Sequence, residues 1–139
     1  MLVRTPSGRK DIRALWMEGR SVKMIDQRLL PGKFRLAMIK THVEMADAIR
    51  DMTVRGAPAI GAAGAYGMAL ARLNRADTNK AAKLLKSTRP TAYDLFYAVD
   101  SMLRLKDGDM IDAANEYADG IVTKCRSIGE AGAPLIKSG

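Results

Sequence analysis

The chain has 139 residues, of which 47% are hydrophobic and 27% are charged, a balance typical of one globular domain with a buried core. It contains no run of about 18 apolar residues, which excludes a transmembrane helix, and residues 1–10 lack the apolar centre of a secretory signal. The single cysteine cannot form an internal disulfide and suits a reducing compartment, so we expect a cytoplasmic protein. One histidine and one cysteine argue against a zinc site, and we expect no metal.

The net charge is +8, and most of the excess lies in the first part of the chain. Residues 1–40 contain ten Lys or Arg and three Asp or Glu, whereas residues 41–139 contain thirteen and twelve. A basic cluster can bind nucleic acid or an acidic partner. Only Trp16 and Phe34 could stack on bases there, so we favour a solvated basic surface and expect no nucleic-acid partner.

Residues 1–13 are polar and basic, and they predict an arm or a linking strand. Residues 14–40 alternate between apolar and polar side chains on either side of two turn sequences, at 18–21 and 29–32. This pattern predicts a β meander of three strands. The apolar residues that carry the alternation are Leu15, Met17, Val22, Met24, Phe34, Leu36 and Met38.

From Thr41 onward the apolar period becomes helical. Capping-box patterns at Thr41/Glu44 and Thr91/Asp94 predict two helix starts. The first helix would carry Val43, Ala46, Ile49, Met52 and Val54 on one side. Further helices are predicted over about 58–73 and 79–87, and the helix after Thr91 should end near Asp107 and Gly108. A long last helix should start at about Met110, with Gly129 and Gly132 bending or ending it.

These elements predict an α+β, mostly α domain over residues 14–139. A small antiparallel three-stranded sheet at 14–40 would be followed by a bundle of about five helices at 41–139.

The most informative segment is 54–67, Val-Arg-Gly-Ala-Pro-Ala-Ile-Gly-Ala-Ala-Gly-Ala-Tyr-Gly. Arg55 supplies a fixed positive charge, Gly56 permits a positive φ or close approach to a ligand, and Pro58 suits the first turn of a helix. The free N–H groups and the positive dipole end of such a helix favour a phosphate or another anion. The alternative is a tight helix–helix contact behind an ordinary loop, because glycines at 61, 64 and 67 leave a smooth face.

Arg89 stands before Pro90 at a second predicted helix start. Proline disfavours helical geometry in the preceding residue, so Arg89 should be extended, and its guanidinium could hold phosphate oxygens. The alternative is that Arg89 pairs with a nearby carboxylate. For Tyr66 we expect packing rather than ligand binding, and for Asp26 a turn-stabilising role.

Several segments, in order, resemble one family. These are Leu-Trp-Met-Glu-Gly at 15–19, Ile-Asp-Gln-Arg-Leu-Leu-Pro at 25–31, Ala-Asp-Ala-Ile-Arg-Asp-Met at 46–52, Arg-Gly-Ala-Pro-Ala-Ile-Gly at 55–61, Arg-Pro-Thr-Ala at 89–92 and Ile-Gly-Glu-Ala-Gly at 128–132. The chain resembles the methylthioribose-1-phosphate isomerase family from about residue 14 onward. That family is related to the α, β and δ subunits of eukaryotic translation initiation factor 2B and to archaeal ribose-1,5-bisphosphate isomerase.

The resemblance implies the N-terminal domain of an enzyme that converts 5-methylthioribose 1-phosphate to 5-methylthioribulose 1-phosphate in methionine salvage. It implies substrate binding by Arg55, Gly56, Ala57 and Arg89, and no cofactor. The catalytic Cys and Asp of the family belong to a following Rossmann-like domain that is absent here. Cys125 has no counterpart among them, so no catalytic residue is assigned to this chain.

We therefore expect a partner that supplies the missing catalytic domain, either as further sequence or as a separate chain, and a homodimer when complete. The alternatives are a non-enzymatic subunit like those of initiation factor 2B and a related isomerase for ribose 1,5-bisphosphate. One departure bears on the substrate, because the isomerase motif more often has Asn where this chain has Asp94. Asp94 would repel a phosphate if it faced the site, unless it only completes the cap at Thr91.

Overall fold

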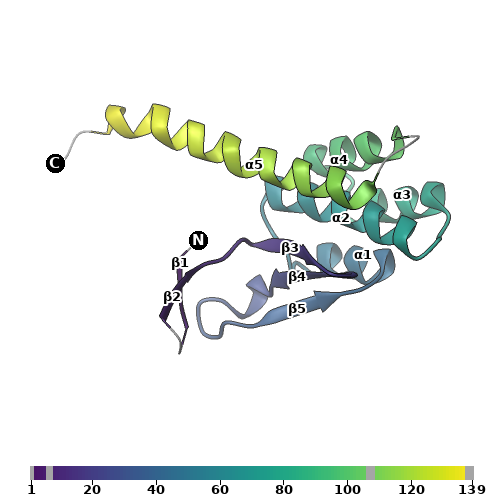
Figure 1. Cartoon of the computed structure of the whole chain (residues 1–139), viewed down its shortest axis with the longest axis horizontal. Coiled ribbons are helices and arrows are strands. Elements are labelled where there is room, and N and C mark those ends of the chain that lie inside the picture. The colour runs from purple at the N-terminus through teal and green to yellow at the C-terminus, as the bar shows by residue number, and fades with distance from the viewer. Residues whose placement is uncertain (1, 6–7, 106–108, 137–139) are drawn as a thin grey trace.

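The computed structural model describes residues 2–5, 8–105 and 109–136, and it places two small antiparallel sheets beside a stack of helices (Figure 1). Strands β1 (Leu2–Thr5) and β2 (Gly8–Asp11) form a hairpin in which Leu2 lies opposite Asp11. The segment expected to be a basic arm therefore contains paired strands. Main-chain hydrogen bonds between antiparallel strands can form without apolar alternation, so the sequence pattern did not indicate this hairpin.

The second sheet has the order β3-β4-β5, with β3 at Leu15–Glu18, β4 at Ser21–Ile25 and β5 at Leu36–Ile39. Val22 and Met24 are fully buried, as the alternation predicts. The predicted phase of the third strand is wrong, because Leu36 and Met38 are exposed and Ile39 is buried. Val22 pairs with Ile39, and residues directly opposite one another share a face of the sheet.

The first helix, α1 (His42–Arg50), begins at the predicted cap, where the Glu44 N–H donates to Thr41 Oγ1 at 3.1 Å. Its buried residues are Met45, Ala46, Ala48 and Ile49. Two predicted members of the buried side, Val43 and Met52, are instead exposed. Met52 follows the end of the helix in a left-handed conformation, with φ 65°, so it has left the helical face.

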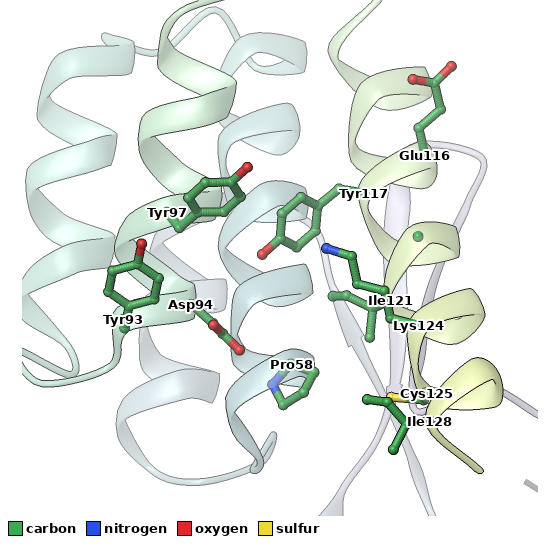
Figure 2. A pocket seen from close by; sticks show the side chains of 11 residues that line it. Pro58, Tyr93, Asp94, Tyr97, Glu116, Tyr117, Ile121, Lys124, Cys125 and Ile128 are labelled. Atoms are coloured by element: carbon green, nitrogen blue, oxygen red, sulfur yellow. The ribbon is translucent and has the colours of Figure 1, made fainter. Parts of the chain in front are cut away.

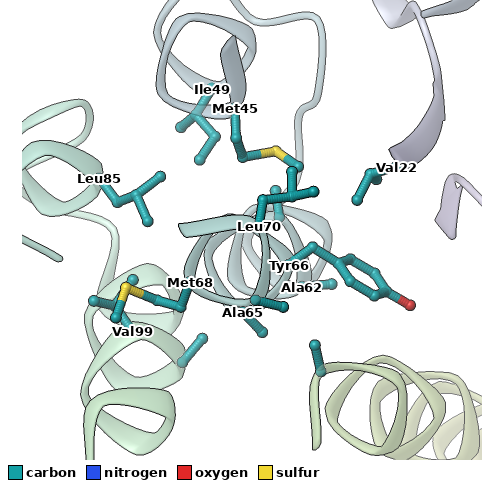
Figure 3. Packing of buried hydrophobic residues seen from close by; sticks show 14 of the residues in the cluster. Val22, Met45, Ile49, Ala62, Ala65, Tyr66, Met68, Leu70, Leu85 and Val99 are labelled. Atoms are coloured by element: carbon teal, nitrogen blue, oxygen red, sulfur yellow. The ribbon is translucent and has the colours of Figure 1, made fainter. Parts of the chain in front are cut away.

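Helix α2 (Ala57–Leu73) lies at the centre of the domain, buried almost without interruption from Ile60 to Ala71. It packs against α1, α3 (Thr78–Ser87), α4 (Tyr93–Leu103) and α5 (Met110–Gly132), and Figure 3 shows side chains converging on it from several sides. The smooth glycine face is confirmed as a surface of close approach. A β-carbon on Gly64 would stand 2.7 Å from Leu95 Cδ1, and one on Gly67 would stand 2.9 Å from Leu85 Cδ2.

The second predicted capping box is wrong. The N-cap of α4 is Ala92, which has no side-chain cap, so neither Thr91 nor Asp94 caps the helix as the pattern requires. Leu95, Ala98, Val99 and Met102 are buried as expected. The predicted end near Asp107 and Gly108 lies outside the described residues, and the assigned helix ends at Leu103.

Helix α5 begins at Met110 and is capped by Asp109, whose Oδ1 accepts from the Ile111 N–H at 2.7 Å. It continues into the short 3-10 turn η2 (Ala133–Leu135). Gly129 does not end the helix, whereas Gly132 is its last residue. The first half packs against the bundle, but from Val122 onward nearly every residue is exposed and the helix projects beyond the body of the domain (Figure 1). Within the described segments, no helix has the length and hydropathy needed to cross a bilayer.

Candidate functional site

The start of α2 is built by a sequence that leaves its N-terminal end open. Gly56 is the N-cap, and its φ of 91° is a conformation that side-chain-bearing residues rarely adopt. The first bond of the helix runs from the Ile60 N–H to the Gly56 carbonyl at 2.9 Å. The N–H groups of Ala57 and Ala59 precede this bond and have no acceptor within the helix, while Pro58 has no N–H to satisfy. The geometry can therefore receive an anion at the positive end of the dipole.

Arg55 is placed at this opening by a contact with the 3-10 turn that follows β4 (η1, Gln27–Leu29). Its Nη2 donates to the main-chain carbonyl of Gln27 at 2.9 Å. The side chain is exposed, and this contact occupies only part of its five-donor fork. The structure thus brings Arg55, Gly56 and Ala57 together in one exposed loop and helix start.

Three cavities open around the start of α2. The largest, of about 500 Å³, lies between α4 and α5 and reaches Pro58. A second, of about 280 Å³, is lined by Gly56 and Pro58 on one side and by Ala118 and Ile121 of α5 on the other. The third, of about 170 Å³, is lined by Arg55 and Gln27 with apolar neighbours. The predicted anion-binding loop therefore borders hollow surface rather than packed protein.

The largest of these cavities, called the α4–α5 groove here, has an aromatic wall (Figure 2). The rings of Tyr93 and Tyr97 stack with centroids 6.4 Å apart. Tyr117, on α5, faces Tyr97, and the centroids of these two rings are also 6.4 Å apart. Burial raises the pKa of Tyr117, and the charge of Asp94 raises it further. The residues that line the groove are Pro58, Tyr93, Asp94, Tyr97, Glu116, Tyr117, Gly120, Ile121, Lys124, Cys125 and Ile128.

Asp94 therefore faces a cavity instead of capping a helix. It shares the groove with Pro58 of the α2 start and with Lys124, a cation among the lining residues. The carboxylate at this position therefore belongs to the groove that reaches the start of α2.

Arg89 lies in the short segment between α3 and α4. It is partly buried and lines none of the three cavities. Its Nε is buried without a hydrogen-bond partner in the described part of the chain. No carboxylate among the described residues pairs with it, so the alternative interpretation as an ion pair finds no support either.

Sequence reasoning missed the groove itself. Its signal is present as tyrosines at 93 and 97, one helical turn apart, and as residues 117, 121, 124 and 128, which share one side of a helix. Each of these two spacings is equally typical of ordinary packing. Only the tertiary arrangement places α4 and α5 so that the two sets of side chains face one another. Tyr66 packs as predicted: it is 1% exposed, and its hydroxyl lies 3.0 Å from Asn115 Oδ1.

The chain is therefore an α+β domain in which a three-stranded sheet is followed by a helical bundle, and the central helix α2 has an open start beside Arg55. Residues 53–139 match the Initiation factor 2 subunit family, and the chain belongs to that family. It is 44% identical over 134 residues to a putative methylthioribose-1-phosphate isomerase of Methanocaldococcus jannaschii, covering 94% of this chain and 41% of that protein. It is 41% identical to the methylthioribose-1-phosphate isomerase of Gloeobacter violaceus, covering 88% of this chain and 38% of that protein.

Solved structures agree in fold. The 5-methylthioribose 1-phosphate isomerase of Pyrococcus horikoshii superposes with a TM-score of 0.84 at 37% identity, over 94% of this chain and 42% of that one. The delta subunit of translation initiation factor eIF-2B from A. fulgidus gives 0.74 at 36% identity, over 93% and 43%. The chain thus spans about two fifths of the length of the relatives it matches.

Proposed function

We propose that this chain is the substrate-binding N-terminal part of a cytoplasmic sugar-phosphate aldose–ketose isomerase of the methylthioribose-1-phosphate type. The substrate would be 5-methylthioribose 1-phosphate and the product 5-methylthioribulose 1-phosphate, as in methionine salvage. The observation that carries the proposal is the open start of α2, where Arg55 and the Gly56 cap flank unpaired N–H groups in a chain closely similar to such isomerases.

In this proposal the chain's own residues bind and orient the substrate. Arg55 and the main chain of Gly56 and Ala57 hold the phosphate, whose attachment at the anomeric carbon prevents simple ring opening. Arg89 would add a second guanidinium from the segment between α3 and α4, as the resemblance implies, although it lines none of the three cavities. Holding the reacting centre in place can contribute several kcal/mol to lowering a barrier.

The proton-transfer groups would come from a Rossmann-like catalytic part that this chain does not include. One side of α5 supports such a partner. Residues spaced alternately by four and three, here called the α5 seam, are buried at first, partly buried at Ile121, exposed at Cys125 and Ile128, and partly buried again at Gly132. The members of the seam are Ala114, Ala118, Ile121, Cys125, Ile128 and Gly132. We propose that the catalytic part covers the exposed half, in a homodimer of the complete protein.

The test is to titrate the purified chain with 5-methylthioribose 1-phosphate and to monitor binding through the chemical shifts of the Gly56 and Ala57 amides in NMR spectra. Saturable shifts at these residues that Arg55→Ala abolishes would support the proposal. Arg72→Ala is the matched control, because Arg72 is an exposed arginine at the opposite end of the same helix. Shifts that survive Arg55→Ala, or no shifts at all, would reject it.

Two related functions are separated by the same experiment. Stronger shifts with ribose 1,5-bisphosphate would indicate an isomerase for that sugar. The similarity to the eIF-2B delta subunit and the carboxylate of Asp94 in the groove favour a regulatory subunit as the second candidate. In that case neither sugar phosphate would shift the α2 start.

A further inference from the structure

A single guanidinium joins two segments that both precede the predicted anion site in the sequence. Arg28 donates through Nε and Nη2 to the two carboxylate oxygens of Asp26, at 2.8 and 2.7 Å. Its Nη1 donates to Asp51 Oδ2 at 2.6 Å. Asp26 follows β4 and caps the 3-10 turn η1 (Gln27–Leu29), whereas Asp51 follows α1. The contact lowers the pKa of Asp26 and raises that of Arg28, so both groups remain charged near neutral pH.

The other oxygen of Asp51 continues the connection toward α2. Oδ1 accepts from the main-chain N–H of Thr53 at 2.9 Å and from its hydroxyl at 2.7 Å. The Thr53 carbonyl in turn accepts from the Gln27 N–H at 3.0 Å. Thr53 is 3% exposed, so these bonds hold a buried point of the loop rather than a free surface turn.

Gln27 is the residue to which Arg55 is bound. Its N–H is tied to Thr53, and its carbonyl accepts from Arg55 Nη2 at 2.9 Å. The chain of contacts therefore runs from Arg28 through Asp51 and Thr53 to Gln27 and ends on the arginine of the helix start. Arg28 itself lines none of the three cavities around that start, so it acts through these neighbours.

We propose that Arg28, held between Asp26 and Asp51, is a positioning residue that sets the conformation of residues 51–56 before an anion binds. Binding then orders fewer groups, because the loop and the side chain of Arg55 are already in place. A planar fork that meets two carboxylates suits this role, since a lysine ammonium cannot reproduce both contacts. The inference rests on the proposed function for the identity of the ligand, but not for the ordering of the loop.

The ordering is tested without any ligand, by amide hydrogen exchange of the purified chain. In Arg28→Met, exchange at Gln27 and Thr53 should accelerate about tenfold or more, while buried amides of α2 change much less. Arg28→Lys should behave like Arg28→Met. The matched control is Arg50→Met, which removes another exposed arginine paired with an aspartate, Asp47, outside this set of contacts. If exchange at Gln27 and Thr53 is unchanged, or accelerates only in parallel with α2, the inference is overturned.

Titration with 5-methylthioribose 1-phosphate then links the loop to binding. If the unaltered chain binds, Arg28→Met should raise Kd about tenfold, Arg50→Met should leave it unchanged, and equal binding by both would overturn the inference. Failure of the unaltered chain to bind would reject the proposed function, while the exchange result would still decide the role of Arg28. Should Arg28→Met not fold, Asp51→Asn removes one arm of the connection and is read in the same way.

Discussion

The hydroxyl of Tyr117 lies 2.9 Å from the point at which a β-carbon on Gly61 would stand, and the main-chain oxygen of Asp94 lies 3.1 Å from that point. Three helices meet here, because Gly61 belongs to α2, Asp94 to α4 and Tyr117 to α5. The absence of a side chain at position 61 is what allows the wall of the α4–α5 groove to approach the start of α2.

Gly61→Ala should therefore destabilise the domain by about 1–3 kcal/mol, because the Tyr117 ring and the α4 main chain must move to admit a methyl group. The gain in helix propensity, up to about 1 kcal/mol, offsets this only in part. The free energy of unfolding from urea titrations measures the difference. The matched control is Gly120→Ala on α5, where nothing lies within 4 Å of the added carbon. That variant should be more stable than the parent by about 0.5–1 kcal/mol, and equal effects of the two substitutions would contradict the packing described.

Stability should fall in acid through Asp26. Its pKa is lowered from 3.8 chiefly by the hydrogen bonds from Arg28, so the folded state binds its proton less readily than the unfolded chain does. The stabilisation is complete above the unfolded pKa and is lost as pH falls through the folded value. Asp26→Asn keeps a capping side chain but removes the charge. The difference in unfolding free energy between parent and variant should be constant at neutral pH and shrink below about pH 4; a difference that does not shrink at all as the pH falls below about 4 would show that the charge is not responsible.

Removal of the Tyr66 hydroxyl should destabilise the domain by about 0.5–1.5 kcal/mol, since it lies 3.0 Å from Asn115 Oδ1 on a side chain that is 1% exposed. Thermal or urea unfolding of Tyr66→Phe measures this. Tyr93→Phe is the control, because Tyr93 is 77% exposed and its loss of a hydroxyl should change stability by less than about 0.5 kcal/mol. Similar costs at the two positions would mean that the buried hydroxyl contributes nothing specific.

The two halves of the α5 seam should respond differently to the same polar residue. Ala118 is 6% exposed, so Ala118→Asn introduces both bulk and an unpaired amide, and we expect a loss of about 2 kcal/mol or more. Ile128 is 71% exposed, and Ile128→Asn should change the unfolding free energy by less than about 0.5 kcal/mol. Both are measured by urea titration of the isolated chain. A large loss at Ile128 would show that the exposed half of the seam is already covered in solution, for example by a second copy.

Much of the fold is predictable from local patterns. The cap at Thr41, the helix after Gly56 and the burial of Val22 and Met24 each depend on residues close together in sequence, and each is found. The phase of the third strand is not of this kind. Its apolar residues alternate at 34, 36 and 38, yet pairing of Ile39 with Val22 turns the opposite set inward. A partner strand decides that register, and the sequence of the strand alone does not contain it.

The candidate site likewise has one part that local sequence predicts and another part that depends on the tertiary arrangement. Arg55, Gly56 and Ala57 are consecutive, so their placement at one helix start follows from local chemistry. Arg89 and Asp94 depend on how α4 is seated against α2 and α5. The structure places Asp94 in the groove and leaves Arg89 outside all three cavities, neither of which periodicity could indicate.

The exposed half of the α5 seam contains the chain's one cysteine, Cys125, between Ile121 and Ile128. Its thiol is accessible in this chain and would be enclosed by anything that packs along the seam. The reactivity of the Cys125 thiol can therefore be used to detect whether another part packs on this side of α5. The rate at which a maleimide labels Cys125, compared in the presence and absence of a prospective catalytic partner, reads directly whether that side of the helix has been covered.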